Sequence, residues 1–269
     1  MVTFSDKWEV DNITFSSRLL VGTGRFESLE KTKRSIELSE SSLVTVAIRR
    51  LEARKNDREE GSLLSAINWK RIWMLPNTAG SKTPDEAIRL GFLGREIAKS
   101  LGQENNRFLK LEVIADEKYL MPDPLGTIKA ADYLIKKGFK IFPYINTDPI
   151  LAAHLEELGC ATLMPLGSAI GSNQGLKNLE NIKIIVEQSN LPVIVDAGIG
   201  RPSDASKAME IGADAVLINT AIASSERPEL MAEAMKHAVI GGRLGYLANP
   251  QSISLKKGGL SSPKKGIPF

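Results

Sequence analysis

Lys110 and Glu112 lie two residues apart in an apolar segment, residues 108–114, and their chemistry could make this chain an enzyme. The segment has the composition of a buried parallel strand, and side chains two residues apart on a strand point to the same side. Burial lowers the pKa of a lysine, and a lysine with a lowered pKa can attack a carbonyl group to form a Schiff base. The alternative is a structural ion pair, because a buried charge is costly unless it is paired.

Asp196 is a second candidate carboxylate, because it ends an apolar run and precedes a glycine-rich turn. A carboxylate beside an imine can act as the general acid or base that moves protons during the reaction. The alternative is a helix cap, but Ser203 and Asp204 lie closer to the expected start of the next helix. Lys110, Glu112 and Asp196 are therefore the predicted catalytic residues.

Short apolar runs alternate with helical patterns along almost the whole chain. Eight runs are expected to form strands: residues 18–21, 43–48, 72–75, 108–114, 140–144, 161–165, 192–196 and 215–218. Capped helices are expected at residues 84–101, 148–158, 203–211 and 228–239. This alternation predicts a parallel sheet, and eight strands favour a single (β/α)8 TIM barrel. The alternative is an open doubly wound sheet, but no Gly-x-Gly-x-x-Gly motif follows the first run.

Polar and glycine-rich segments follow the sixth, seventh and eighth expected strands, where a barrel places its active site. They supply six candidate substrate-binding residues: Gly167, Gly171, Ala197, Gly198, Asn219 and Thr220. Glycine lets backbone N–H groups approach an anion, and the loops after the last two strands form the usual phosphate site of such barrels. The alternative is that these segments are tight turns that need glycine for their backbone shape.

Arg49 and Arg50 follow the second expected strand and have two interpretations. They could bind a phosphate or a carboxylate group, because guanidinium groups match the geometry of both. Equally, they could belong to a charged loop that continues through Arg58 and Glu60.

Composition argues against several classes of protein. The chain has 269 residues, a net charge of +3 and one cysteine, Cys160, so no internal disulfide is possible. Its basic residues do not form the stripe of a nucleic-acid binder, and no apolar run reaches the roughly 20 residues of a membrane helix. Two scattered histidines indicate no metal site. Residues 1–248 are predicted to form one barrel domain and residues 249–269 a polar tail. Without a signal-peptide pattern, the expected location is the bacterial cytosol or the plastid stroma.

The chain resembles the bacterial and plastid thiazole synthases of thiamine biosynthesis. The resemblance rests on six segments: residues 17–24, 45–50, 75–80, 110–114, 164–175 and 196–200. It extends from about residue 15 to residue 248, and the order and spacing of the segments are more specific than any one of them. The two ends of the chain and the charged residues 51–57 fit no family pattern. The resemblance implies a TIM barrel that acts as a sulfur-incorporating transferase.

The resemblance also implies substrates and partners. The family joins 1-deoxy-D-xylulose 5-phosphate, 2-iminoacetate and sulfur that arrives as a thiocarboxylate on a ubiquitin-like sulfur carrier protein. Lys110 would form the Schiff base, Glu112 and Asp196 would act as acid and base, and Gly171 with the Ala-Gly and Asn-Thr pairs would bind the sugar phosphate. No cofactor and no metal are implied. A homo-oligomer such as a tetramer, or a complex with an iminoacetate-forming enzyme, is expected.

Two other functions use the same residues. A Schiff-base aldolase or transaldolase would need the lysine and the phosphate loops but would cleave a carbon–carbon bond without a sulfur carrier. A phospho-ligand-binding subunit without catalytic activity would bind the sugar phosphate reversibly and form no imine. The sequence also leaves open which of Glu112 and Asp196 acts first.

Overall fold

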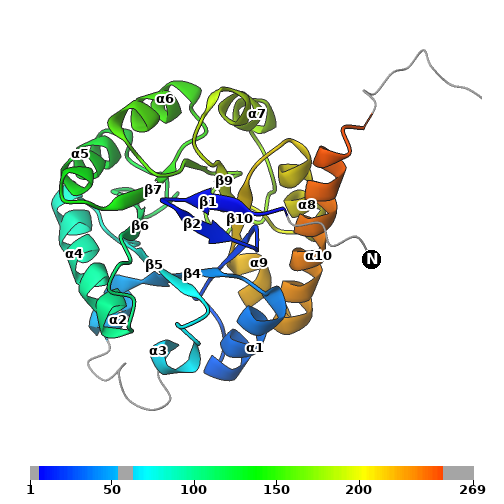
Figure 1. Cartoon of the computed structure of the whole chain (residues 1–269), viewed down its shortest axis with the longest axis horizontal. Helices are drawn as coiled ribbons and strands as arrows, with labels where there is room; N and C mark the ends of the chain where they lie inside the picture. The colour runs from blue at the N-terminus through cyan, green and yellow to red at the C-terminus, as the bar shows by residue number, and fades with distance from the viewer. Residues whose placement is uncertain (1–5, 54–62, 251–269) are drawn as a thin grey trace, which may run out of the picture.

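Eight parallel strands form a closed ring in the computed structural model, which describes residues 6–53 and 63–250 (Figure 1). They are β3 (Leu19–Gly22), β4 (Leu43–Ala47), β5 (Trp73–Asn77), β6 (Phe108–Leu111), β7 (Lys140–Ile145), β8 (Met164–Pro165), β9 (Ile194–Asp196) and β10 (Ala215–Ile218). They pair in the order β8-β7-β6-β5-β4-β3-β10-β9. Bridges from Leu163 to Val193 and from Leu166 to Asp196 join the two end strands. The predicted (β/α)8 barrel is therefore confirmed, and the open sheet is wrong.

Each expected strand is present in the structure, although β6 ends earlier than predicted and β8 and β9 begin later. Every residue of β3 and of β10 is buried, as expected for parallel strands covered on both faces. The strand expected over residues 108–114 ends at Leu111. It ends there because the Thr78 hydroxyl binds the backbone of Glu112, accepting from its N–H and donating to its C=O, both at 2.8 Å.

Helices surround the ring of strands (Figure 1). They are α1 (Leu29–Ser39), α2 (Ile48–Ala53), α3 (Leu63–Ala66), α4 (Pro84–Ser100), α5 (Pro124–Lys136), α6 (Pro149–Leu158), α7 (Leu179–Gln188), α8 (Pro202–Glu210), α9 (Thr220–Ala223) and α10 (Pro228–Leu247). α10 continues beyond the predicted end at residue 239, because Gly242 keeps a buried face against α8. A Cβ atom at Gly242 would lie 2.3 Å from the Ser206 carbonyl oxygen, so only glycine permits this close packing.

Most helix boundaries follow the expected capping chemistry. The Asp148 side chain accepts hydrogen bonds from the N–H groups of Ile150 and Leu151 at the start of α6, as predicted. Helix α8 differs, because its N-cap residue is Arg201 and Ser203 lies inside the helix. The Asp204 carboxylate accepts from the N–H of Arg201 at 3.0 Å, so the expectation that Ser203 caps this helix is wrong.

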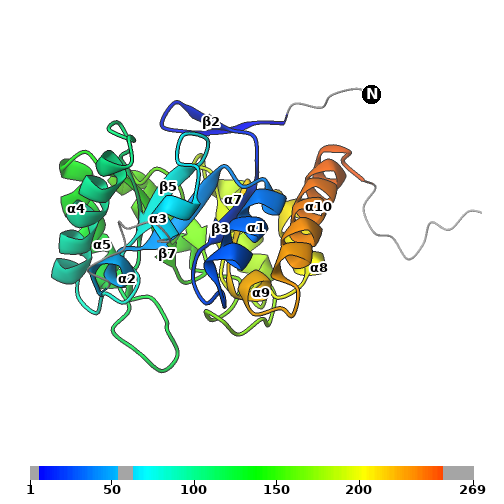
Figure 2. The same cartoon turned by 90° about the horizontal axis from the view of Figure 1, so that it is seen from below.

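An antiparallel hairpin, β1 (Trp8–Val10) and β2 (Ile13–Phe15), covers one end of the barrel and was not predicted (Figures 1 and 2). Its turn residues, Asp11 and Asn12, both have positive φ angles, 51° and 61°. Two such residues make a turn whose twist matches that of a hairpin, and aspartate and asparagine tolerate this conformation. The Asp-Asn pair was the available sequence signal.

The hairpin closes the N-terminal end of the barrel with apolar side chains. Trp8 and Phe15 are buried and belong to one cluster with Phe108 and Phe142 from the barrel strands. The ring centroids of Phe15 and Phe108 are 6.0 Å apart, and those of Phe108 and Phe142 are 5.3 Å apart. The half of the barrel interior next to the hairpin, at the N-terminal ends of the strands, is therefore a packed aromatic and aliphatic core.

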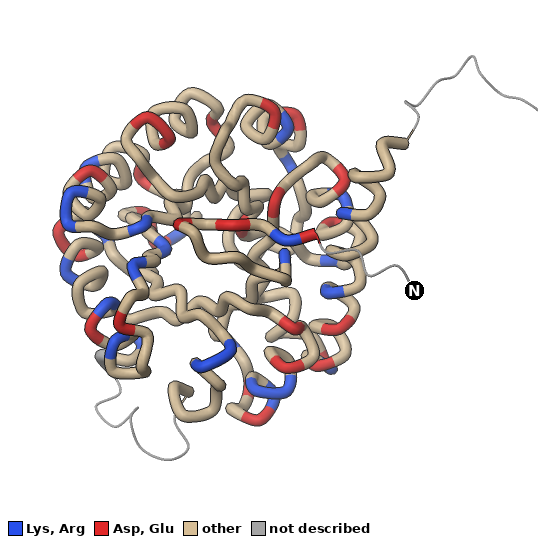
Figure 3. The backbone as a smooth tube through the Cα atoms, viewed as in Figure 1, with Lys and Arg blue, Asp and Glu red and all other residues tan. Residues whose placement is uncertain are grey.

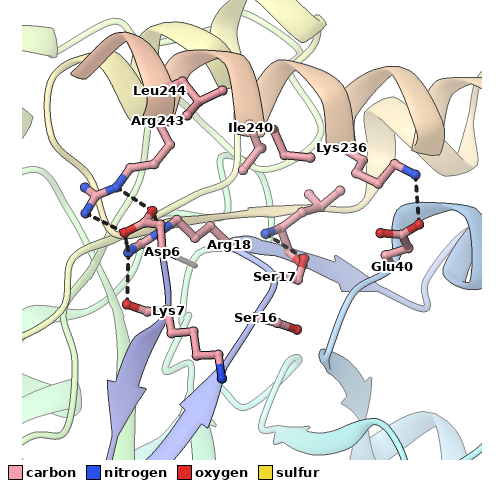
Figure 4. Close-up of a pocket in the computed structure, with 12 residues that line it drawn as sticks. Asp6, Lys7, Ser16, Ser17, Arg18, Glu40, Lys236, Ile240, Arg243 and Leu244 are labelled. Carbon is pink, nitrogen blue, oxygen red and sulfur yellow. Dashed lines mark hydrogen bonds and ion pairs between the residues drawn. The ribbon is translucent and has the colours of Figure 1, made fainter. Parts of the chain in front are cut away.

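Ion pairs tie the start of the described chain to the last long helix at this same end (Figure 4). The Asp6 carboxylate lies 2.7 Å from the Arg18 guanidinium and 2.8 Å from that of Arg243 on α10. Burial works to raise the pKa of Asp6, but hydrogen bonds from both arginines outweigh it and hold that pKa below its usual value. The arrangement stabilises the closure of the N-terminal end.

The outer surface carries charges of both signs, interspersed around the ring of helices (Figure 3). Among the helices of the described residues, none combines the length and the apolar character that crossing a bilayer requires. Helix α10 ends at Leu247, one residue before the predicted domain boundary. The predicted tail lies outside the described residues except for Asn249 and Pro250, so the division into barrel and tail stays a prediction.

Candidate active site

A cavity of about 250 Å3 lies at the C-terminal end of the barrel strands, opposite the hairpin. Residues of β4, β5, β6, β9 and β10, of helix α2 and of the segments after β3, β5, β6, β8, β9 and β10 contribute to its wall. Eight of the nine predicted site residues line it: Lys110, Glu112, Gly171, Asp196, Ala197, Gly198, Asn219 and Thr220. Residues that are up to 110 positions apart in the sequence therefore meet in one small space.

Lys110 lies between the two predicted catalytic carboxylates. Its Nζ atom is 2.5 Å from Asp196 Oδ2 and 3.1 Å from Glu112 Oε1. The three side chains are buried, with exposed fractions of 6%, 4% and 6% for Lys110, Asp196 and Glu112. The Tyr144 ring is also close, with its centroid 5.6 Å from Nζ. The arrangement brings an amine together with two groups that can exchange protons with it.

The expected lowering of the Lys110 pKa is wrong for the free protein. Burial is the largest single influence and works to lower this pKa, but attraction to Asp196 and Glu112 outweighs it and raises the pKa above 10.5. Segment 108–114 alone contains one carboxylate, Glu112, and β9 brings a second, Asp196, even closer to Lys110. Lys110 is therefore an ammonium in the free protein, and an ammonium group must lose a proton before it can act as a nucleophile.

Asp196 is the carboxylate best suited to take that proton. Burial raises the pKa of Asp196, and the negative charge of Glu112 raises it further, while the Lys110 ammonium opposes both. A raised pKa makes Asp196 a stronger base than an ordinary aspartate. Because Asp196 Oδ2 lies 2.5 Å from Nζ, the proton would move directly between the two side chains.

Glu112 is held in place by Asn77, the last residue of β5, and by Thr78, which follows it. The Asn77 amide donates a hydrogen bond to Glu112 Oε1 at 2.9 Å, and Asn77 Oδ1 in turn accepts from the N–H of Ala79 at 2.9 Å. The backbone of Glu112 binds the Thr78 hydroxyl, as described above. Asn77 and Thr78 lie in the segment 75–80, which carried the resemblance but received no predicted role.

The turn after Asp196 has a strained backbone that depends on its residue types. Ala197 and Gly198 both have positive φ angles, 63° and 76°, and this conformation is uncommon for alanine. A Cβ atom at Gly198 would lie 2.1 Å from Ser168 Oγ and 2.4 Å from the Ser168 nitrogen. The tight turn alone therefore requires glycine, but its position beside Lys110 and Asp196 places the turn in the cavity wall.

Gly171 and Asn219 line the cavity, whereas Gly167 does not. The N–H of Gly167 donates to the Asp196 carbonyl oxygen at 3.1 Å, and a Cβ atom there would meet Leu176 at 2.9 Å. Gly167 thus supports the wall from behind. Asn219 packs so closely on β3 that a Cβ atom at Gly22 would lie 2.7 Å from the Asn219 Cβ.

Two arginines in the cavity wall were absent from the predicted site. Arg50, one of the two residues with an open interpretation, lines the cavity and donates a hydrogen bond to the Thr23 carbonyl oxygen at 3.1 Å. Arg49 instead points away and pairs with Glu86 at 2.9 Å. Arg25 follows β3 and also lines the cavity. Its signal was its place directly after a barrel strand, beside a Gly-Thr-Gly sequence.

Other candidate groups lie away from this cavity. A larger cavity of about 490 Å3 lies at the N-terminal end, beside the mutually paired Asp6, Arg18 and Arg243, where barrels place stabilising rather than catalytic residues. Cys160 is buried, which raises the pKa of its thiol to about 12 and keeps it unreactive. Within residues 6–53 and 63–250, no three His, Cys, Asp or Glu side chains are grouped as metal ligands.

Comparison with known proteins gives one consistent family. Residues 9–263 match the family described as Thiazole biosynthesis protein ThiG. A protein named Thiazole synthase from Phaeodactylum tricornutum is 58% identical over 244 residues, which cover 90% of each chain. Residues 9–263 make up most of the chain, so the match includes both ends of the barrel.

Of two further relatives, one is a longer protein and the other is a chain in a crystallised complex. The Bifunctional protein ThiO/ThiG of Nostoc is 58% identical over 235 residues, which cover 87% of this chain but 36% of that protein. A crystal structure of the BexX/CysO complex of Amycolatopsis orientalis has a chain that is 30% identical to this one. That match has a TM-score of 0.79 and covers 91% of this chain and 97% of the other.

Replacing Lys110 is expected to destabilise the fold in a pH-dependent way. The variant Lys110→Met leaves two buried carboxylates without their cation, so we expect a loss of about 3 kcal/mol in the free energy of unfolding at pH 8. In the variant, burial and the negative charge of Glu112 keep the pKa of Asp196 above its unfolded value, without the opposing charge of Lys110. Its stability should therefore increase as the pH falls towards the carboxyl range. Urea unfolding at several pH values measures this.

The variant Lys110→Met with Glu112→Gln and Asp196→Asn serves as the control. Without the buried charges, it should recover most of the lost stability and lose the pH dependence. Equal stability of wild type and Lys110→Met at pH 8 would contradict the prediction.

Proposed function

The chain belongs to the thiazole synthase family of thiamine biosynthesis, and we propose that it forms the thiazole through a Schiff base between Lys110 and 1-deoxy-D-xylulose 5-phosphate. The observation that carries the proposal is the position of Lys110 Nζ between two carboxylates, in a cavity whose wall also contains the predicted phosphate loops. An amine that must lose and regain protons needs such neighbours, whereas a purely structural ion pair needs only one.

The first step is transfer of a proton from Lys110 to Asp196. The neutral amine then attacks the C2 ketone of the sugar, and loss of water gives an imine. Once protonated, this imine draws electrons from C3, so the C3 proton becomes acidic. Glu112 or Asp196 removes it, and a proton returned to the sugar moves the carbonyl character from C2 to C3.

Sulfur enters at C3 in the following step. We propose that the thiocarboxylate sulfur of a ubiquitin-like sulfur carrier attacks C3, that the acyl group passes from sulfur to the C3 oxygen, and that the carrier leaves as a carboxylate with that oxygen, so that sulfur stays on C3. The nitrogen of 2-iminoacetate then displaces the Lys110 amine from C2, and attack of the sulfur on the iminoacetate carbon closes the ring. Loss of water gives the thiazole phosphate carboxylate. The loops that contain Gly171, Ala197-Gly198 and Asn219-Thr220 hold the phosphate throughout, which keeps the reacting carbonyl near Lys110.

The proposed carrier would dock on apolar side chains beside the cavity. The loop between β6 and α5 projects from the end opposite the hairpin (Figure 2), and it carries the exposed side chains of Tyr119 and Met121. Leu125 and Ile150, in the first turns of α5 and α6, are 78% and 67% exposed. These four residues form the proposed docking surface, because exposed apolar groups that gather near a site mark protein contacts. The presence of a relative in the BexX/CysO complex supports a protein partner.

The source of iminoacetate and the assembly of the protein are further parts of the proposal. The joining of ThiO and ThiG in the Nostoc protein supports physical association with a second enzyme, which would hand over the unstable iminoacetate. We also propose a homo-oligomer, such as a tetramer, and a location in the bacterial cytosol or the plastid stroma. The three-substrate reaction proposed here distinguishes the chain from an aldolase, which needs no sulfur donor.

Reduction with borohydride is expected to trap the proposed imine. Incubation of the protein with 1-deoxy-D-xylulose 5-phosphate and borohydride should give a covalent adduct, and peptide mapping by mass spectrometry should place it on Lys110. The variant Lys110→Ala should give no adduct, whereas Lys129→Ala, which removes an exposed lysine from α5, should react normally. An adduct on another lysine would contradict the assignment of the Schiff base to Lys110. Rapid reversible binding of the sugar phosphate with no adduct would favour the alternative of a binding subunit without catalytic activity.

The role of Asp196 predicts a distinctive pH dependence of trapping. Protonated Asp196 cannot accept the Lys110 proton, so the trapping rate should fall as the pH falls through the raised pKa of Asp196. Asp196→Asn should lower the rate about 100-fold at pH 8 and remove this acid limb. Trapping rates measured from pH 5 to pH 9 test this, and an unchanged acid limb in the variant would show that another group accepts the proton.

The docking surface predicts a selective loss of sulfur transfer. Leu125→Asp should raise the carrier concentration needed for half-maximal thiazole formation by about 10-fold, because it places a charge in an apolar contact. Borohydride trapping of the sugar should not change, since the residue lies outside the cavity. Tyr133→Asp, at the other end of the same helix, is the matched control. Equal carrier dependence in all three proteins would refute the proposed surface.

A further inference from the structure

The charge of the proposed reacting groups has the wrong sign for the proposed substrate. Lys110 carries one positive charge and Glu112 and Asp196 carry one negative charge each, so the three together carry a net charge of −1. A sugar phosphate monoester carries close to two negative charges at pH 7. Backbone N–H groups of the phosphate loops offer only partial positive charges. Some other cation must therefore make this cavity attractive to the phosphate.

Among the described residues, 6–53 and 63–250, Arg25 and Arg50 are the other charged residues that line the cavity. With both guanidinium groups included, the lining changes from a net charge of −1 to +1. In the part of the chain that the structure describes, neither arginine forms an ion pair with a carboxylate, whereas neighbouring Arg49 does so with Glu86. Both side chains are exposed to solvent at the mouth of the cavity. Their charges are thus available to an incoming anion.

The two guanidinium groups lie against the loops that are proposed to hold the phosphate. A Cβ atom at Gly171 would lie 3.2 Å from Arg25 Nη1, so the side chain of Arg25 reaches from the β3 loop to the loop after β8. A Cβ atom at Gly24 would lie 3.1 Å from Arg50 Nη2 and 2.8 Å from the Asn219 amide nitrogen. Arg50 and Asn219 therefore both lie close to Gly24, at the place that a Cβ atom would occupy.

The backbone conformation of Arg25 gives a second, independent observation. Its φ angle is 67°, in the left-handed region that residues with side chains seldom adopt. Two other non-glycine residues that line the cavity, Ala197 and Asn173, also have positive φ angles, of 63° and 52°. Strained residues gather at sites where the direction of a group matters for binding. At Arg25 the strained conformation accompanies a side chain that lies across the phosphate loops.

We propose that Arg25 and Arg50 form a two-guanidinium clamp that binds the phosphate and makes the cavity select phosphorylated over unphosphorylated sugars. The proposal rests on the proposed function, because it assigns the substrate phosphate to that same cavity. Guanidinium groups bind phosphate oxygens through two parallel N–H donors, which gives orientation as well as attraction. Arg50 also donates to the Thr23 carbonyl oxygen, so the experiment must separate a binding role from a role in holding this loop.

The test compares trapping of two sugars by the full-length protein. The variants are Arg25→Gln, Arg50→Gln and the double variant, with Arg50→Lys as a conservative variant and Arg49→Gln as the control outside the cavity. Each is assayed with borohydride, using 1-deoxy-D-xylulose 5-phosphate and unphosphorylated 1-deoxy-D-xylulose over a range of concentrations. Each Arg→Gln change should raise the half-saturating concentration of the phosphorylated sugar at least 10-fold and change the maximal rate less than 3-fold.

Trapping of the unphosphorylated sugar should be the same in wild type and variants, and Arg50→Lys should recover part of the affinity for the phosphorylated sugar. An equal loss for both sugars would overturn the proposal, because it would show that the arginines only maintain the loop. An unchanged preference for the phosphorylated sugar would also overturn it.

Calorimetric titration with inorganic phosphate tests the clamp without any imine chemistry. Wild type should bind phosphate, and the double variant should bind it at least 10-fold more weakly at the same salt concentration. If wild type traps neither sugar, the Schiff-base proposal fails, while the phosphate titration still decides the clamp. Equal phosphate affinity in wild type and the double variant would refute the clamp even if trapping succeeds.

Discussion

The contact of one ammonium group with two carboxylates inside the barrel is the interaction on which the rest of the site depends. Three charged side chains that are each at most 6% exposed would be costly to bury separately. They are tolerated because Lys110 pairs with both acids and Asn77 donates to Glu112. This requires β5, β6 and β9 to keep their positions relative to one another, which only a closed ring of strands enforces.

The same contact explains why Lys110 is a latent nucleophile. Two carboxylates raise its pKa, so the resting amine is protonated and harmless to other carbonyl compounds. Burial raises the pKa of Asp196 at the same time, which makes this carboxylate a stronger base. A bound substrate carbonyl can then compete for the amine while the proton remains 2.5 Å away on Asp196. In the proposed mechanism, the amine becomes reactive only when its proton moves to Asp196, so Lys110 need not be neutral in the free protein.

The two ends of the barrel divide stability from chemistry. At one end, the hairpin packs Trp8 and Phe15 into an aromatic core, and Asp6 ties this end to α10. At the other end, the loops contain residues with positive φ angles, and exposed apolar side chains lie in the loop after β6 and in the first turns of α5 and α6. Such features cost stability, and the closed end can offset that cost because the barrel strands connect the two ends rigidly. The loops are therefore free to be built for binding.

The sequence by itself determined the barrel and most of the residues of the site. The alternation of apolar runs and helical patterns was enough for all eight strands, because parallel strands buried on both faces are apolar throughout. The period of a strand placed Lys110 and Glu112 on one side, and strand ends placed the polar loops at one end of the ring. The hairpin was not predicted because its strands have only three residues each, too few to show a clear alternation of apolar and polar residues.

Only the tertiary structure decided how charges are distributed in the site. The direction of the Lys110 pKa depends on Asp196, which is 86 positions away in the sequence and 2.5 Å away in space. The choice between Arg49 and Arg50 depends on which side of a helical turn faces Glu86 and which faces the cavity. Gly167 and Gly171 were both predicted to bind substrate, but only Gly171 lines the cavity. Electrostatic energy depends on distance through space, and sequence patterns report only which face of an element a residue occupies.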